Sequence, residues 1–149
     1  MTRIWTIGYE KAGVGDLVAT LKEAGVELIV DVRELPNSRR AGFSKNMLAA
    51  SLAEAGIGYR HMKPLGTPKA GRDAAKKGDV ATMHAIIEQK LDTPEAQLAL
   101  REAAGLAAGK RICLLCLEHD WRGCHRNNVA QRLAAFGCEA VHLAPEADL

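Results

Sequence analysis

The amino-acid sequence predicts an α/β fold, with a single domain over residues 1–149 and a mostly parallel sheet of about five strands that carries helices on both faces. Short apolar runs alternate with longer stretches whose apolar residues recur at helical spacing, which is the order of strand–helix–strand units. The run VELIVDVR (26–33) is apolar almost throughout, as is typical of a strand buried on both faces of a parallel sheet. A chain of 149 residues can bury about 70% of the surface that it exposes when unfolded, so it needs neither a metal nor a disulfide to fold.

The first half of the chain supplies three of the predicted strands and two of the predicted helices. Leu17 and Leu21 share the apolar face of the first helix, and Gly25 follows its end. Ser44 is suited to cap the second helix, which Gly56 closes. In order, the expected elements are a strand at residues 4–9, a helix at 14–24, a strand at 26–33, a loop at 34–44, a helix at 45–55 and a strand at 57–62.

The second half begins with a segment that breaks this pattern. Residues 63–79 contain two prolines and three glycines, and six basic side chains lie between Arg60 and Lys77. We therefore expect an irregular connection there, of the kind that is often functional. Thr93 and Pro94 suit the start of a later helix. The remaining expected elements are helices at residues 80–91 and 94–108, a strand at 111–118, a helix at 124–136 and a strand at 140–144.

Composition and charge argue against several classes of protein. The net charge of +2 is too small to indicate a nucleic-acid-binding protein by itself. Four cysteines are few for a disulfide scaffold, and no apolar run approaches the roughly 18 residues that a membrane span needs. The first residues lack the basic and apolar regions of a signal peptide. We therefore expect a cytoplasmic protein with reduced cysteines and no membrane partner.

Polar residues follow four of the predicted strands at the point where each strand ends. Tyr9 follows the first strand, and Asp31 and Arg33 close the second. His61 ends the third, and Cys116 lies near the end of the fourth. Because the carboxyl ends of parallel strands meet at one edge of a sheet, and sites form at that edge, we expect these residues to share one site.

Four motifs stand out along the chain: TIGYE (6–10), VDVRELPNSRRAGF (30–43), YRHMKPLG (59–66) and CLEHDWRGCHR (116–126). With them the sequence resembles the domain-of-unknown-function 488 (DUF488) family of bacterial and archaeal proteins, whose signature C-x-E-x-D-P-x-x-C-H-R is similar to the last motif. It departs from the family pattern at Trp121, where proline is common, and at Thr67, where a second glycine is common. The resemblance implies a cytosolic α/β domain with a polar pocket built from these motifs, and it implies no particular reaction.

The cysteines raise the question of a metal site. Cys113 and Cys116 have CxxC spacing, but side chains three apart in a strand point to opposite faces. Side chains of Cys124 and His125 would diverge by about 100° if both residues began a helix. We therefore expect no cofactor, with zinc as the alternative. The residues that could hold zinc are Cys116, Cys124, His125 and either His119 or His61.

Thiol chemistry is a second interpretation of the same motif. Cys116 precedes a loop and a helix, and a helix N-terminus with nearby arginines lowers the pKa of a thiol. Cys116 or Cys124 is therefore a candidate nucleophile, against the alternative of a buried, inert thiol. Cys116 and Arg122 also match the C-x5-R spacing of cysteine phosphatases. The intervening residues include two acids and no glycine, which does not suit a phosphate-binding loop.

Anion binding is a third interpretation. Arg33, Arg39 and Arg126 could converge on a phosphate or carboxylate, since guanidinium groups bind both with two hydrogen bonds. The alternative is that they form structural ion pairs with neighbouring acids. Asp31 and Glu118 could work as acid and base in a partly dry cleft, or each could neutralise an arginine, which we favour.

These observations predict an enzyme-like domain of uncharacterised activity that binds a small phosphate- or carboxylate-bearing ligand at the carboxyl edge of the sheet. The alternative is a non-catalytic module that binds nucleic acid or a protein through the basic segment 60–77. Whether the protein is an enzyme stays open. The candidate catalytic residues are Cys116, Glu118, His125 and Asp31, and the candidate anion-binding residues are Arg33, Arg39, Arg126 and Tyr9.

Overall fold

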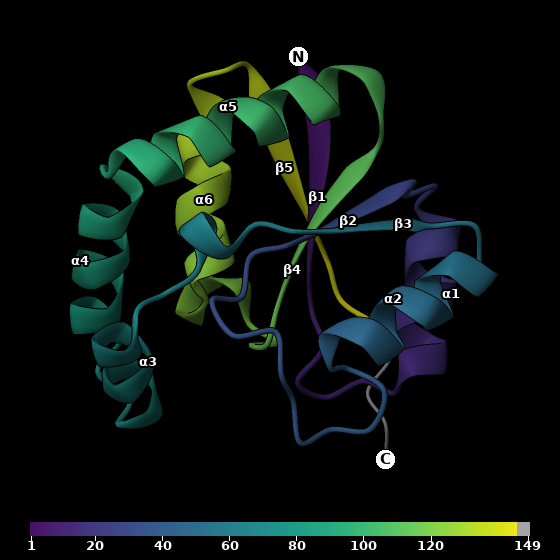
Figure 1. Cartoon of the computed structure of the whole chain (residues 1–149), viewed down its shortest axis with the longest axis horizontal. Coiled ribbons are helices and arrows are strands. Elements are labelled where there is room, and N and C mark those ends of the chain that lie inside the picture. Colours follow the sequence, from purple (N-terminus) through teal and green to yellow (C-terminus); the bar gives the residue numbers. More distant parts are fainter. Residues whose placement is uncertain (146–149) are drawn as a thin grey trace.

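Five parallel strands form the centre of the protein, in the order β3-β2-β4-β1-β5 (Figure 1). The structure is a computed structural model, and it describes residues 1–145. Its sheet confirms the predicted α/β class and the predicted number of strands. The strands are β1 (Thr2–Gly8), β2 (Leu28–Asp31), β3 (Gly58–His61), β4 (Ile112–Cys116) and β5 (Cys138–Leu143).

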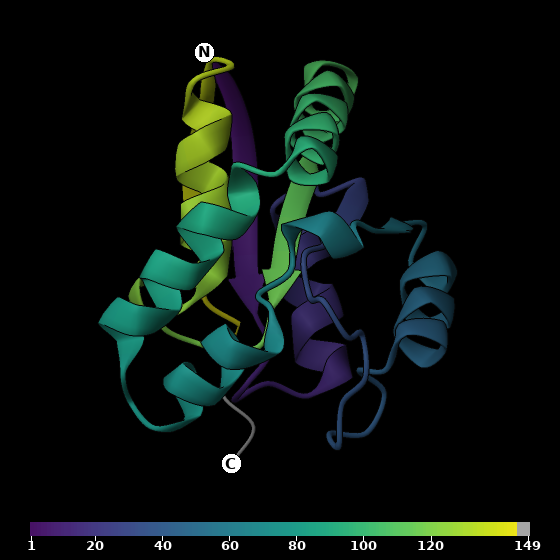
Figure 2. The same ribbon diagram turned by 60° about the vertical axis from the view of Figure 1, so that its left-hand side comes forward.

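Helices cover both faces of this sheet, as predicted. Figures 1 and 2 show α1 and α2 together on one face, with the remaining helices on the other. Two short 3₁₀ turns, η1 (Lys63–Leu65) and η2 (Trp121–Gly123), lie in the connections. The helices are α1 (Val14–Glu23), α2 (Lys45–Glu54), α3 (Lys69–Lys76), α4 (Val80–Leu91), α5 (Pro94–Gly109) and α6 (His125–Ala134).

The sheet separates two hydrophobic cores because successive side chains of a strand point to opposite faces. In β4, Cys113 and Leu115 pack with the side chains of α1 and α2, whereas Leu114 and Cys116 pack with those of α3 to α6. Cys113 and Cys116 therefore lie on opposite faces, which confirms that this CxxC pair cannot share a metal ion. The four cysteines are all buried and free.

The expectation of an irregular segment over residues 63–79 is wrong in part, because the segment contains α3. Gly71 and Ala74 form the buried side of this short helix, and a side chain at Gly71 would press on Thr67 and α4. Gly78 follows the helix with φ +80°, a conformation that favours glycine. The apolar face of α3 is narrow and consists of a glycine and an alanine among basic residues. The sequence of this segment therefore shows no hydrophobic periodicity.

Among residues 1–145, no helix has the length and apolar character needed to cross a membrane. The cytoplasmic location stays a prediction. The assignment of the whole chain, residues 1–149, to one domain of the DUF488 type also stays a prediction.

Candidate functional site

The candidate site lies where β4 ends and α6 begins, at the carboxyl edge of the sheet. Cys116 is the last residue of β4, and Cys124 is the N-cap residue of α6. Cys124 has extended backbone angles (φ −122°, ψ 141°), whereas His125 is already helical. The divergence of these two adjacent side chains was expected only if both residues were helical. That condition is not met, because the chain turns between them.

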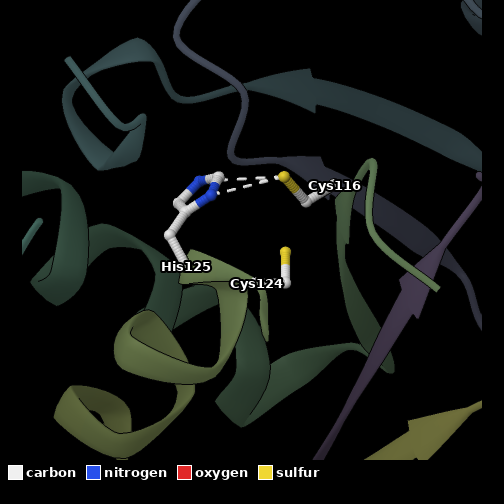
Figure 3. A group of neighbouring side chains, drawn as sticks. All are labelled: Cys116, Cys124 and His125. Carbon is white, nitrogen blue, oxygen red and sulfur yellow. Dashed lines mark hydrogen bonds between the residues drawn. The ribbon is translucent and has the colours of Figure 1, made fainter. Parts of the chain in front are cut away.

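The side chains of Cys116, Cys124 and His125, which we call the Cys–His cluster, converge (Figure 3). Their sulfur and nitrogen atoms all lie within 4.8 Å of one another. The Nδ1 atom of His125 is 3.3 Å from the Sγ atom of Cys116. All three residues are buried, with Cys124 fully shielded from solvent. The structure thus brings three of the residues considered for zinc into one compact group.

A backbone carbonyl fixes the orientation of the His125 ring. The Nε2 atom of His125 lies 2.6 Å from the carbonyl oxygen of Val32, at the end of the neighbouring strand β2. A carbonyl oxygen only accepts hydrogen bonds, so Nε2 carries the hydrogen and Nδ1 is turned toward the sulfur atoms. Metal-binding histidines are commonly oriented by this kind of bond from the other ring nitrogen.

Glu118 lies beside the cluster, on the loop that leaves β4. Its Oε2 atom is 3.7 Å from the Sγ atom of Cys116. The backbone of Glu118 is fixed, because Nη1 of the fully buried Arg126 donates to its carbonyl oxygen at 2.5 Å. Arg126 also donates through Nε to Thr6 and through Nη2 to the carbonyl of His119. The guanidinium of Arg126 therefore holds the loop and β1 together.

Gly8 explains why this loop can lie so close to β1. A side chain at position 8 would overlap the carbonyl group of Glu118 and crowd the Arg126 guanidinium. The glycine of the TIGYE motif is thus required for the position of Glu118.

Burial and charge set the protonation of the cluster. Burial raises the pKa of Cys116 well above its ordinary value, and the hydrogen bond and negative charge of Cys124 add to this shift. Burial also opposes ionisation of Cys124, but hydrogen bonds from its two cluster neighbours and the positive charges of His125 and Arg126 outweigh it, so its pKa is lowered. Burial disfavours charge on His125, but the hydrogen bond and charge of Cys124 outweigh it and raise the pKa of the ring. Burial and the charge of Cys124 raise the pKa of Glu118 to about 7.

Asp31 and Arg33 lie on the other face of the sheet and form an ion pair. Nε and Nη2 of Arg33 donate to the two carboxylate oxygens of Asp31, at 2.9 and 2.7 Å. Nη1 of Arg33 donates to the hydroxyl of Tyr9 and to the carbonyl of Phe43, and Tyr59 donates its hydroxyl to Asp31. Tyr9 and Phe43 belong to the core under α1 and α2. We call these five residues the Asp–Arg network.

The structure does not bring all predicted site residues to one place. Asp31, Arg33 and Tyr9 are separated from the Cys–His cluster by the sheet. The interpretation that we favoured, in which each acid neutralises an arginine, agrees with the pairing of Asp31 and Arg33. For Glu118 it is wrong, because within residues 1–145 the nearby Arg126 donates to the backbone carbonyl of Glu118 and not to its carboxylate. The guanidinium groups of Arg33 and Arg126 are buried and bonded to protein atoms, whereas Arg39 is exposed in the loop after β2.

Neither histidine considered as a fourth zinc ligand belongs to the Cys–His cluster. The ring of His61 contacts the carbonyl oxygen of Arg33 through Nε2 at 2.7 Å, and His119 donates its backbone N–H to Glu10. Within residues 1–145, the group that converges contains only the two cysteines and His125. Two shallow surface clefts, one between β3, η1 and α5 and the other between α6 and β5, contain no residue of the cluster.

Several residues that support the site carry no recognisable signal in the sequence. The Nδ1 atom of His84 in α4 contacts Asn128 of α6 at 2.7 Å, and its Nε2 atom contacts the carbonyl of Arg122 in η2 at 3.1 Å. The Trp121 ring stacks on His142 of β5 with centroids 4.1 Å apart. These contacts join distant segments, so no local spacing predicts them.

Comparisons with known proteins identify one family. The model of a family described as "Domain of unknown function DUF488" matches residues 14–133 of the chain. No curated protein and no solved structure matches it.

Proposed function

We propose that this chain, which belongs to the DUF488 family over residues 14–133, binds one divalent metal ion of the zinc class through Cys116, Cys124 and His125. The family description names no reaction, so the proposal starts from the geometry. One observation carries it: three soft ligand atoms from two elements of the fold converge within 4.8 Å in a buried place. The metal centre would be the reactive part of an enzyme-like domain.

The distances within the cluster support this proposal. In a tetrahedral zinc site, Zn–S bonds of about 2.3 Å and Zn–N bonds of about 2.0–2.1 Å hold sulfur and nitrogen ligands about 3.5 Å apart. The Sγ atom of Cys116 and the Nδ1 atom of His125 are 3.3 Å apart. Only small side-chain shifts would therefore place an ion between them.

The surroundings of the ligands also support it. The backbone N–H of Arg126 points at the Sγ atom of Cys124 from 3.5 Å, which stabilises a thiolate. The bond from His125 to the carbonyl of Val32 leaves Nδ1 as the ligating atom. Without an ion, burial keeps Cys116 protonated, and the lowered pKa of Cys124 and raised pKa of His125 favour a thiolate beside a protonated ring. A zinc-class ion would instead hold both sulfur atoms as thiolates and the imidazole in its neutral form.

The alternative function, binding of nucleic acid or a protein through the basic segment 60–77, has less support. Arg60 pairs with Glu102, Lys69 with Asp73, and Arg72 with Glu34. Three of the six basic side chains of this segment are thus matched by acids within the protein. The segment therefore offers less free positive charge than its sequence indicates.

Metal analysis of protein purified without an affinity tag tests the proposal. We expect close to one equivalent of zinc-class metal per chain, and a thiolate charge-transfer band after replacement by cobalt(II). The variants Cys116→Ser and Cys124→Ser should lose the metal while keeping their helical circular dichroism. Cys138→Ser is the matched control, because Cys138 is buried in the same core but lies outside the cluster. A folded wild-type protein that takes up no stoichiometric zinc or cobalt would overturn the proposal.

A further inference from the structure

We infer that Glu118 is the fourth protein ligand of this centre, so that two cysteines, one histidine and one glutamate hold the ion. The inference rests on the proposed metal centre and deepens it by completing the ligand set. In the sequence, His119 and His61 are the candidates for the fourth position, and the structure places both outside the Cys–His cluster. A carboxylate lies beside the cluster instead, and it belongs to Glu118.

The position of this carboxylate fits a ligand of the same ion. The Oε2 atom of Glu118 is 3.7 Å from the Sγ atom of Cys116. In a tetrahedral site with a Zn–S bond of about 2.3 Å and a Zn–O bond of about 2.0–2.2 Å, the sulfur and oxygen atoms are about 3.6 Å apart. The separation in the structure therefore matches that of two ligands of one ion.

The side chain of Glu118 can complete the set while its backbone stays in place. The carboxylate is outside the group of atoms that all lie within 4.8 Å of one another, so it has to turn toward the rest of the cluster. A glutamate side chain rotates about three bonds, which allows this turn. The backbone is fixed, because Arg126 donates to the carbonyl of Glu118 and Gly8 leaves room for that carbonyl. The loop thus holds the carboxylate at the cluster.

The carboxylate of Glu118 has no cationic partner among the side chains of residues 1–145. Arg126 donates to the backbone carbonyl of Glu118, and none of the ion pairs in this part of the chain includes its carboxylate. Asp31 on the opposite face, by contrast, is paired with Arg33 through both oxygens. A partly buried carboxylate is costly without a compensating charge, and a metal ion supplies that charge.

The charges of the buried centre balance when Glu118 belongs to the ligand set. The guanidinium of Arg126 is fully buried and donates to Thr6 and to two backbone carbonyls, but it forms no ion pair within residues 1–145. A divalent ion and this guanidinium together carry three positive charges. Two thiolates and the carboxylate of Glu118 carry three negative charges. The set of four ligands therefore leaves the centre neutral, as buried groups require.

The ligand set also identifies the ligand that a substrate would replace. Four protein ligands close the coordination sphere, whereas catalytic zinc sites keep one position for water or substrate. Thiolate and imidazole suit zinc-class ions, and a carboxylate oxygen suits harder ions such as magnesium or calcium. Glu118 is thus the ligand that gives way when another group binds the ion.

The full chain loaded with cobalt(II) tests this ligand set. Glu118→Gln keeps the size of the side chain, but it removes the negative charge of the ligand. We expect the variant to keep its helical circular dichroism, to bind cobalt about 100-fold more weakly and to have a changed visible cobalt spectrum. Glu10→Gln is the matched control, because Glu10 accepts from the backbone N–H of His119 in the same loop but lies outside the cluster. The control should have the cobalt affinity and spectrum of the wild type.

The other outcomes separate this inference from the proposed function. A Glu118→Gln variant with the wild-type cobalt spectrum would overturn the inference at any affinity, because the coordination of the ion would be unchanged. The same spectral change in Glu10→Gln would also overturn it, since the effect would then arise from the loop. In both cases the metal centre itself would stand. Absence of cobalt binding in the folded wild type would instead overturn the proposed function.

Discussion

The two faces of the sheet carry buried polar groups of different kinds at the same carboxyl edge. Under α1 and α2, the Asp–Arg network joins a carboxylate to a guanidinium through two hydrogen bonds, and two tyrosines and a carbonyl complete it. On the opposite face, the Cys–His cluster gathers the side chains of two cysteines and a histidine, and the Glu118 carboxylate lies 3.7 Å from the Sγ atom of Cys116. The first group is joined by short hydrogen bonds between charged groups, whereas the sulfur atoms of the second have longer contacts, with the His125 ring and with the backbone N–H of Arg126.

This difference distinguishes polar residues that stabilise the fold from polar residues that can bind a ligand. In the sequence both kinds follow the ends of predicted strands. A buried ion pair whose hydrogen bonds are complete has no capacity left for a ligand, and its removal exposes an uncompensated charge. The thiol of Cys116 is a weak hydrogen-bond partner for the His125 ring, which lies 3.3 Å away, so a ligand can improve on this contact. We therefore expect changes in the Asp–Arg network to act on stability alone, and changes in the cluster to act on metal binding.

The largest expected effect is on the Asp–Arg network. Asp31→Ala should lower the free energy of unfolding by about 3–5 kcal/mol, because it leaves Arg33 buried without its counter-charge. Chemical denaturation with circular dichroism measures it. The fraction that remains folded should still bind metal at the wild-type stoichiometry. A loss below about 1 kcal/mol would show that Arg33 finds another partner, and it would contradict the contrast between the two faces.

The next effect concerns the cluster. Removing metal with a chelator should destabilise the wild type by about 2.7 kcal/mol relative to protein with free ion at 100 times its Kd. Thermal unfolding with and without the chelator measures the difference. In Cys124→Ser the chelator should change nothing, since the ligand set is incomplete. An equal chelator effect in wild type and Cys124→Ser would place the metal elsewhere.

A smaller effect is expected from Tyr59→Phe. The change removes one hydrogen bond to the Asp31 carboxylate but leaves the two bonds from Arg33 in place. We expect a loss of about 1.5–3 kcal/mol at most, the range for a hydrogen bond to a charged group, in equilibrium denaturation. Metal affinity should stay at the wild-type value, and a matching loss of metal affinity would mean that the two faces are coupled through β2.

The smallest effect is a pH dependence from the stacked pair of Trp121 and His142. Burial, helped by the charges of Arg126 and Arg122, lowers the pKa of His142 below its ordinary value of 6.5. The folded protein thus disfavours the protonated ring, so stability is complete above pH 6.5 and is lost as the pH falls through the lowered pKa. His142→Phe keeps an aromatic ring against Trp121 but cannot titrate. Unfolding measured between pH 7 and pH 5 should show a shallower decline in His142→Phe, and identical slopes would exclude His142 as the cause.

Much of the fold follows from local pattern. The runs around β2 and β4 are so apolar that burial on both faces was predictable, and both strands are buried throughout. Helix α3 was not predictable, because its buried side consists of Gly71 and Ala74 and the helix forms only by close approach to α4. Periodicity detects large apolar side chains, and this helix has none on its inner face.

The candidate site was predictable only in part, for reasons of register. Asp31 in β2 pairs with Leu115 in the neighbouring strand β4. Paired residues share a face of the sheet, so the side chain of Cys116 points to the opposite face from Asp31. Nothing in the sequence states this pairing, since it depends on the contact of strands more than 80 residues apart. The convergence of the Cys124 and His125 side chains likewise depends on the backbone angles of a single residue, the N-cap Cys124.

The strand order has a consequence for the nascent chain. β4 lies between β1 and β2 in the sheet, yet it is the fourth strand to be synthesised. The first two strands therefore leave the ribosome without the strand that joins them, and the sheet has no centre until residue 116 is available. Because the Cys–His cluster lies within residues 116–125, the proposed metal ion could bind only after this central strand has been synthesised. Metal binding would then stabilise a sheet that has already formed. A chain truncated before β4 should have neither a complete sheet nor a metal site.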